Sequence, residues 1–256
     1  MHFSSLLCGE TVFSPDGRVL ATANRDKSIV QLFDIASGVE RLRIDRKSCS
    51  PQFSPDGRTL AVEDFEDAFV RLFDASTGTE RLRMPKYYTN FGESPRFSPD
   101  GRSMALVSNL KYGTGLSVEL FDVGTGKELG HIESGIFGSG SEHDEPLTEF
   151  AAAFSPDSRF FAVGAAVSDP VRLFEATTGK ELASLKLGWG FAGVAFSPDG
   201  RYLAAASTNG ATRLLEVKTL RVLASGQHAL AVTHLEFSPD SRFLVTSGED
   251  GTALVT

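Results

Sequence analysis

The sequence predicts an all-β protein made of six copies of one small antiparallel sheet. The hexapeptide FSPDGR or FSPDSR occurs six times in 256 residues, and a second element, such as VRLFDASTGTERLR, follows each of the first five copies. Successive hexapeptides begin 40 to 44 residues apart, except for one interval of 57 residues. Self-similarity at a nearly fixed period indicates a repeat architecture in which each copy is one structural unit. The hexapeptides begin at Phe13, Phe53, Phe97, Phe154, Phe196 and Phe237.

Each copy is expected to form four short strands joined by three tight turns. In the first copy, the apolar runs ETVFS and RVLATA lie on either side of SPDG and are typical of strands. Pro15 presets φ for the second turn position, Asp16 suits the third, and Gly17 supplies a left-handed residue. A second turn leads to VQLFD, and ASG forms a third turn before VERLRI. The repeated aspartates of SPD are therefore interpreted as turn residues rather than as catalytic carboxylates.

A four-stranded meander of this size cannot bury both of its faces alone, whereas radial stacking of such sheets buries them. We therefore predict a β-propeller of six four-stranded blades that forms a single domain over residues 1–256. The blades are expected to start near residues 7, 47, 91, 148, 190 and 231. The last copy ends at GTALVT, inside its third strand, so the last blade is incomplete at the C-terminus. Two interpretations stay open: residues 1–6 supply the closing strand, or the sequence is a piece of a longer protein.

The repeat resembles the WD40 repeat in the form common in bacterial proteins, and the resemblance covers essentially the whole chain. Phe-Asp, Phe-Glu or Leu-Glu stands where that family has its Trp-Asp pair. The resemblance implies a binding module whose blades often contain a hydrogen-bonded tetrad of His, Ser or Thr, Asp and Trp. Only the last copy comes close to this tetrad, with His228, Ser247 and Asp250, and it lacks the Trp. We therefore expect packing of Phe, Leu and Val to hold the blades together. The matching pairs begin at Phe33, Phe73, Phe121, Phe174 and Leu215.

Composition and motifs exclude several functional classes. The formal net charge of −8 argues against a nucleic-acid binder. No stretch approaches the ~20 apolar residues of a membrane span, and the first residues lack a secretory signal pattern, so a cytoplasmic protein is expected. Cys8 and Cys49 are too few for a disulfide framework or a four-cysteine zinc site. No HExxH, GxSxG before a helix, or GxxxxGK[ST] motif occurs, so we predict no catalytic residue, metal ligand or cofactor.

Departures from the repeat indicate where a partner would bind. The long interval contains an expanded connection over residues 134–149, and the third copy expands its second turn over residues 108–116. In a WD40 propeller these connections emerge on one face, together with the segments PKYYTNFGE and LGWGFAG. Aromatic side chains would supply contact area there, and carboxylates would meet Lys or Arg of the partner. We expect a protein or peptide to bind through Tyr87, Tyr88, Phe91, Tyr112, Glu142, Asp144, Glu145, Trp189 and Phe191.

The preferred hypothesis is a non-enzymatic protein–protein interaction scaffold that belongs to a larger signalling protein. One alternative is a propeller enzyme of the lactonase or quinoprotein type, which would need metal or cofactor ligands converging at the central channel. The sequence offers no such set. The other alternative is a periplasmic propeller, in which FSPDGR turns are also frequent. The LFDxxTGxE element and the missing signal sequence count against it. Oligomeric state is not predicted.

Overall fold

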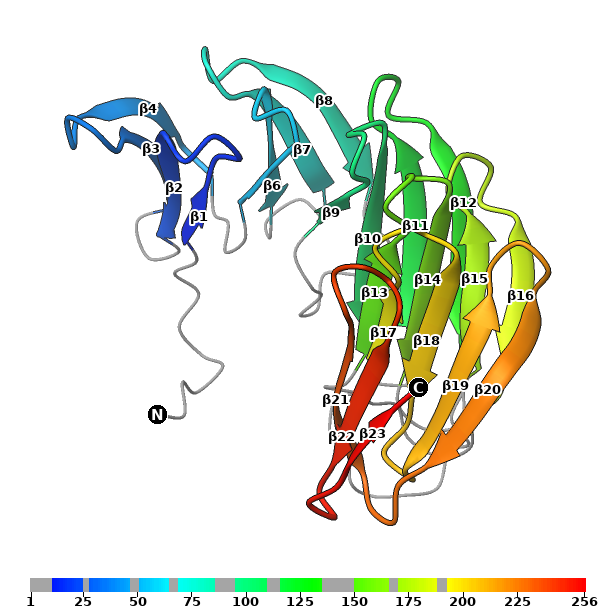
Figure 1. Ribbon diagram of the computed structural model, residues 1–256. Helices are drawn as coiled ribbons and strands as arrows, with labels where there is room; N and C mark the ends of the chain where they lie inside the picture. Colours follow the sequence, from blue (N-terminus) through cyan, green and yellow to red (C-terminus); the bar gives the residue numbers. More distant parts are fainter. Residues whose placement is uncertain are drawn as a thin grey trace, which may run out of the picture. The chain divides into compact units, whose positions relative to one another are not determined.

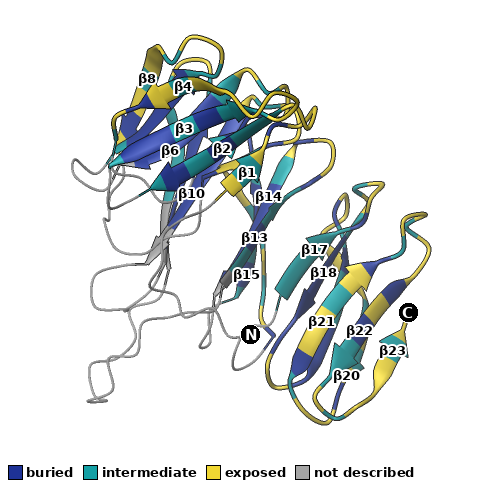
Figure 2. Cartoon of the chain, turned by 90° about the vertical axis from the view of Figure 1, so that its left-hand side faces the viewer, coloured by how far each residue is buried: buried dark blue, intermediate teal, exposed yellow. Residues whose placement is uncertain are grey.

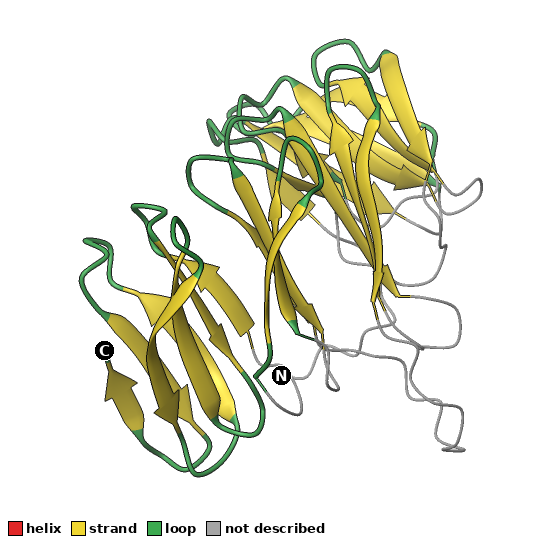
Figure 3. Ribbon diagram, turned by 90° about the vertical axis from the view of Figure 1, so that its right-hand side faces the viewer, coloured by secondary structure: helices red, strands yellow, loops and turns green. Residues whose placement is uncertain are grey.

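The computed structural model contains strands, turns and connecting loops, and no helix, in the residues that it describes (Figure 1; Figure 3). The prediction of an all-β protein is confirmed. Contacts divide the chain into two compact units, one of residues 1–108 and 117–129 and one of residues 109–116 and 130–256. The described residues are 11–24, 28–46, 51–64, 69–85, 95–109, 116–134, 150–165, 170–187 and 193–256.

The strands follow the repeat along the chain. The strands of the first three copies are β1 (Thr11–Phe13), β2 (Val19–Asn24), β3 (Ile29–Asp34), β4 (Glu40–Ile44), β5 (Gln52–Phe53), β6 (Thr59–Asp64), β7 (Phe69–Asp74), β8 (Glu80–Pro85), β9 (Arg96–Phe97), β10 (Ser103–Asn109), β11 (Leu116–Asp122) and β12 (Glu128–Ser134). The strands of the last three copies are β13 (Phe150–Phe154), β14 (Phe160–Ala165), β15 (Val171–Glu175), β16 (Glu181–Leu185), β17 (Gly193–Phe196), β18 (Tyr202–Ala206), β19 (Ala211–Glu216), β20 (Arg221–Gln227), β21 (Val232–Phe237), β22 (Leu244–Gly248) and β23 (Ala253–Val255).

Each copy of the repeat forms one antiparallel meander, here called a blade and numbered along the chain. Blades 1 to 5 have four strands each, and neighbouring strands follow the order of the chain from β1-β2-β3-β4 to β17-β18-β19-β20. Blade 6 has the three described strands β21-β22-β23. The propeller-type fold class is thus confirmed, and the C-terminal copy contributes three strands, as expected. Residues 1–6, which supply the closing strand in one of the two interpretations, lie outside the described residues.

The FSPD turn is closed by its own serine and aspartate side chains. In blade 1 the Ser14 hydroxyl donates to Asp16 Oδ1 at 2.6 Å, and the backbone N–H of Arg18 donates to the same oxygen at 3.1 Å. The backbone N–H of Val19 donates to Ser14 Oγ at 2.9 Å. The serine-to-aspartate hydrogen bond is 2.6 Å long in all six blades. Each aspartate therefore satisfies donors of its own turn, as expected of a turn residue.

Neighbouring FSPD turns also contact one another within each unit. A Cβ atom placed on Gly57 of blade 2 would lie 3.5 Å from Pro15 Cδ of blade 1. In blade 6, Ser241 occupies the equivalent position with φ 61°, and its hydroxyl accepts a 3.0 Å hydrogen bond from the backbone N–H of Asp199 in blade 5. The recurring turn therefore shapes each blade and also contributes to the contact between successive blades.

These hydrogen bonds make the stability of the protein dependent on pH. The Ser14 hydroxyl lowers the pKa of Asp16 below its ordinary value, and the Ser54 and Ser238 hydroxyls do the same for the pKa of Asp56 and Asp240. A carboxyl whose pKa is lower in the folded state stabilises the fold above its unfolded pKa of about 3.9 and loses that contribution as the pH falls below it. We expect the urea midpoint to fall steeply below about pH 4, where unfolded aspartates take up protons first.

Urea unfolding of the wild type and of Ser54→Ala, followed by circular dichroism at a series of pH values, tests this expectation. Ser54→Ala removes one hydroxyl donor, so its midpoint should depend less on pH in the acid range. A midpoint that stays level between pH 5 and pH 3 would contradict the assigned role of the Ser–Asp pairs.

The turn between the third and fourth strands has its own recurring geometry. Asp34 Oδ1 accepts hydrogen bonds from the backbone N–H of Ser37 at 2.9 Å and from its hydroxyl at 2.8 Å. Gly38 follows with φ 69°, a left-handed conformation that favours glycine. In blade 5 the same position is Leu220, with φ 59°, and its N–H donates to the Glu216 carbonyl as that of Gly38 does to the Asp34 carbonyl. Blade 5 therefore keeps the turn while placing a leucine in a strained conformation.

Leu220→Gly is expected to raise the free energy of unfolding by about 0.5–1 kcal/mol. Relief of the left-handed strain exceeds the extra entropy that glycine has in the unfolded chain, and the Leu220 side chain is more than a third exposed. Urea unfolding measures the change. Leu220→Ala is the matched control, because it removes the same side chain and keeps the strain, and it should give no such gain. A loss of stability in Leu220→Gly would show that side-chain packing outweighs the strain.

The apolar core lies between neighbouring blades, because each blade has two apolar faces. In the first unit, Ala21 and Leu32 of blade 1 pack with Leu60 and Phe73 of blade 2. Similar clusters join blades 2 and 3, blades 4 and 5, and blades 5 and 6. The outer strands β4 and β8 are largely exposed (Figure 2). Four residues in the position of the family's tryptophan are buried: Phe73, Phe121, Phe174 and Leu215. Packing of Phe, Leu and Val thus holds these blades together, as expected.

Candidate functional site

The predicted partner-binding residues all fall outside the part of the chain that the structure describes. They belong to the connections at 86–94, 110–115, 135–149 and 188–192. Their binding role stays a prediction. The residues concerned are Tyr87, Tyr88, Phe91, Tyr112, Glu142, Asp144, Glu145, Trp189 and Phe191.

The described residues include a buried histidine network in blade 6. His228 follows β20 directly and is 2% exposed. Its Nε2 atom lies 2.9 Å from Thr246 Oγ1 on β22, and its Nδ1 atom lies 3.0 Å from Thr252 Oγ1 and 3.5 Å from Asp250 Oδ1. A Cβ atom on Gly248 would lie 2.9 Å from His228 Nδ1, so a residue without a side chain leaves room for the ring. The network connects the entry to β21 with the turn between β22 and β23.

The hydrogen bonds of Asp250 fix the direction of this network. The Thr252 hydroxyl donates to Asp250 Oδ1 at 2.7 Å, and the backbone N–H of Ala229 donates to Asp250 Oδ2 at 2.7 Å. The Thr252 hydroxyl lowers the pKa of Asp250 well below its usual range. Because Thr252 uses its proton on Asp250, its oxygen accepts from His228 Nδ1–H, and Nε2 accepts from Thr246. His228 is therefore held as a structural group and has no proton-transfer partner in the described residues beyond this network.

The structure brings His228 and Asp250 together as predicted. The hydroxyl that contacts His228, however, belongs to Thr246 and not to Ser247. Side chains alternate between the two faces of a strand, so neighbours on β22 point in opposite directions. Thr246 is 3% exposed and faces His228, whereas Ser247 Oγ lies 3.3 Å from Thr233 Oγ1 on the other face. The β22 sequence LVTSG already indicates this. Leu244 and Thr246 are alternate residues of the strand and therefore lie on the same buried face.

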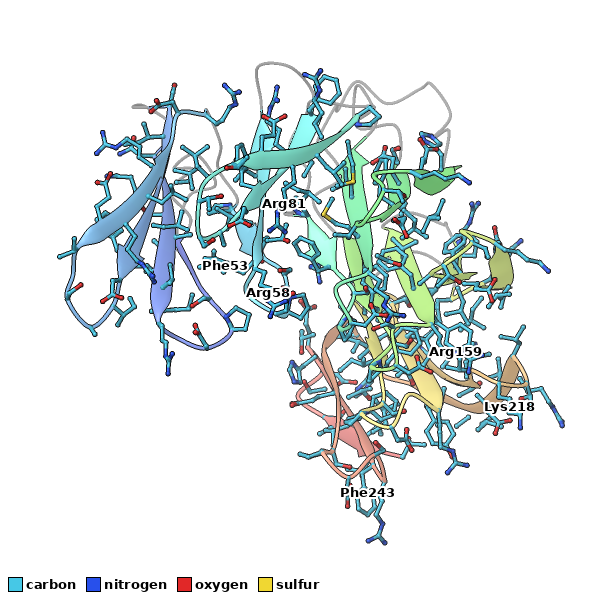
Figure 4. All side chains as sticks on the ribbon, turned by 90° about the horizontal axis from the view of Figure 1, so that it is seen from above. Phe53, Arg58, Arg81, Arg159, Lys218 and Phe243 are labelled. Atoms are coloured by element: carbon cyan, nitrogen blue, oxygen red, sulfur yellow. The ribbon has the colours of Figure 1, made fainter. Side chains whose placement is uncertain are left out.

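A cleft of about 620 Å³ lies between blades 1 and 2 within the first unit. Its lining includes the FSPD turns of both blades and the turn that follows β7. The apolar side chains in the lining include those of Val19, Leu32, Phe53 and Ala75. Three arginines line the same cleft: Arg41 of β4, Arg58 directly before β6, and Arg81 of β8. Figure 4 shows Phe53, Arg58 and Arg81 on blade 2. The volume is in the usual range for a ligand site.

Sequence reasoning missed these arginines. Arg41 and Arg81 belong to the tetrapeptide ERLR, which follows the third turn in the first two copies of the repeat only. This departure is a signal, but nothing in the sequence places it beside Arg58. Arg41 and Arg58 line the same cleft because they lie on consecutive blades, which stack on each other.

A smaller cavity of about 200 Å³ lies along the first strands of blades 4 to 6 in the second unit. Small and apolar residues dominate its lining, including Ala151, Gly193 and Val194, and His234 is its one titratable side chain. His234 Nε2 lies 3.2 Å from Glu236 Oε2, and both side chains are exposed. Within the described ranges, no three His, Cys, Asp or Glu side chains are grouped so that they would hold a metal ion. None of the described segments forms a helix long and apolar enough to cross a membrane.

Comparisons with known proteins agree with this architecture. No curated protein matches the sequence. The chain is similar to hydrazine synthase of Kuenenia stuttgartiensis, with 17% identity and a TM-score of 0.56 over 96% of this chain and 82% of that one. Because 1740 chains of solved structures match, and identity is low, this likeness shows the fold alone. The model of the WD domain, G-beta repeat family matches residues 186–214 and 217–255. Residues 186–255 are thus similar to WD40 repeats, and the same turns and pair positions recur in the earlier blades.

Proposed function

We propose that the chain is a non-enzymatic protein–protein interaction module, a WD40-repeat scaffold of the bacterial type that acts in the cytoplasm as part of a signalling protein. One observation supports this most: the polar side chains that recur from blade to blade are used in structural hydrogen bonds. The SPD aspartates accept from their own turns, and His228 is held by Thr246, Thr252 and Asp250. Function is then left to surfaces that vary between copies, which suits binding.

The aromatic connections remain the first surface to test. Tyrosine and tryptophan bury large area at a small cost in side-chain entropy, and the carboxylates near them would pair with a basic partner. We expect wild-type protein to retain specific partners from extracts of its source cells and the double variant Tyr88→Ala/Trp189→Ala to lose them. The double variant Phe13→Ala/Val39→Ala is the control, because both of its side chains are exposed on described residues.

Two outcomes would contradict the proposal. Equal retention by wild type and by both double variants would remove the aromatic connections as the binding surface. Stoichiometric metal in the purified protein, together with turnover of a lactone or alcohol, would instead favour the enzyme alternative. Fractionation of the source cells tests the cytoplasmic location.

A further inference from the structure

We propose that the cleft between blades 1 and 2 is a second binding site, which takes an acidic peptide segment of a partner protein. A Glu or Asp side chain of the peptide pairs with Arg58 and Arg41, and a neighbouring apolar side chain packs beside Phe53. None of the residues that line this cleft belongs to the aromatic connections. The proposal rests on three properties of the cleft: its charges, its apolar lining and its size.

The carboxylates of the cleft accept hydrogen bonds inside their own turns, whereas the Arg58 guanidinium is attracted to Asp56 without forming a close ion pair. Asp56 accepts from the Ser54 hydroxyl at 2.6 Å and from the backbone N–H of Arg58 at 3.0 Å. Asp16 is held in the same way in blade 1. The Arg58 guanidinium forms no ion pair with any residue that the structure describes. A ligand carboxylate would therefore meet a guanidinium whose attraction to Asp56 involves no close ion pair, while a ligand cation would have to compete with hydrogen bonds inside the turns.

The other two arginines differ in how firmly they are held. Arg81 pairs closely with Asp74, which also accepts from Ser76 and so fixes the wall of the cleft. Arg41 lies 3.8 Å from Asp34, and its side chain is 55% exposed. A contact of this kind is worth little, so Arg41 can turn to a ligand at small cost. Arg58 and Arg41 thus come from opposite walls of the cleft and would hold one carboxylate between them.

The apolar part of the lining favours a peptide over a bare anion. Val19 and Ala75 are partly exposed beside the arginines, and Phe53 lies next to them in the core between the blades. About 620 Å³ accommodates several residues rather than one small ion. An acidic residue next to a leucine, isoleucine or phenylalanine would satisfy both kinds of surface. The net charge of −8 means that recognition depends on these local arginines and not on long-range attraction.

Selection of a linear heptapeptide library on the full chain tests the proposal. We expect enriched peptides with Asp or Glu beside an apolar residue, and fluorescence anisotropy with the labelled best peptide should show weaker binding at high salt. Arg58→Ala should weaken the affinity for that peptide about tenfold or more, as expected for loss of a charged hydrogen bond. Arg58→Glu should be rescued by a peptide with Lys in place of its acidic residue.

Arg18→Ala is the matched control, since Arg18 has the same turn position in blade 1, is 83% exposed and does not line the cleft. Circular dichroism and thermal unfolding confirm that each variant is folded. The proposal is overturned if no peptide is enriched, if the enriched peptides lack an acidic residue, or if Arg58→Ala and Arg18→Ala bind equally well. Peptide binding that is lost in Tyr88→Ala/Trp189→Ala but kept in Arg58→Ala would support the proposed function and would show that the peptide does not bind in this cleft.

Discussion

Replacing Phe121 by alanine is expected to lower the free energy of unfolding by about 3–5 kcal/mol. The Phe121 ring is 0% exposed and packs in one cluster with Leu72 and Met84 of blade 2 and with Met104 and Leu106 of its own blade. Alanine would remove these contacts and leave a cavity at the contact between two blades, where the backbone of two sheets limits collapse. The loss is a large part of the stability of an ordinary domain.

Urea unfolding followed by circular dichroism measures the effect, with controls that separate burial from chemistry. Phe13→Ala makes the same chemical change at a residue that is 60% exposed, and it should cost at most about 0.5 kcal/mol. Phe121→Leu keeps most of the volume and should cost about 1 kcal/mol. If Phe121→Ala and Phe13→Ala were equally mild, packing at the position of the missing tryptophan would not hold these blades together.

The parts of the fold that were predictable from the sequence depend on local interactions. Ser14, Asp16 and Arg18 form the FSPD turn within five residues, so the same short string produces the same turn wherever it occurs. One such string, together with the apolar runs and the two further turns of the same copy, defines one meander. The residues next to each turn determine the strand that follows it. The number and order of the strands could therefore be predicted from the repeat.

The parts that were not predictable depend on contacts between distant residues. Arg41 and Arg58 share a cleft because blades 1 and 2 pack together, and no feature of either segment alone indicates that the two arginines are neighbours. Ser241 joins its turn to Asp199 across 42 residues, again through the packing of two blades. Thr246 was within reach of the sequence, because counting alternate residues along β22 from Leu244 places it on the buried face.

His228→Ala is expected to lower the free energy of unfolding by about 2–4 kcal/mol, the second largest effect. The change leaves the buried Thr246 hydroxyl without its acceptor and leaves a space beside Gly248. An unpaired buried polar group costs about 1–3 kcal/mol, and the lost ring contacts add to this. Asp250 and Thr252 would remain bonded to each other, so the turn after β22 should keep its shape.

Three further variants decide which hydroxyl belongs to this network. Thr246→Val removes the hydroxyl that faces His228 and should cost about 1–2 kcal/mol, whereas Ser247→Ala should stay within about 0.5 kcal/mol. The double variant His228→Ala/Thr246→Val should be less destabilised than the sum of the two single changes, because the second removes the group that the first leaves unpaired. A cost for Ser247→Ala as large as that for Thr246→Val would instead place Ser247 in the network, and β22 would then have to present its other face to His228.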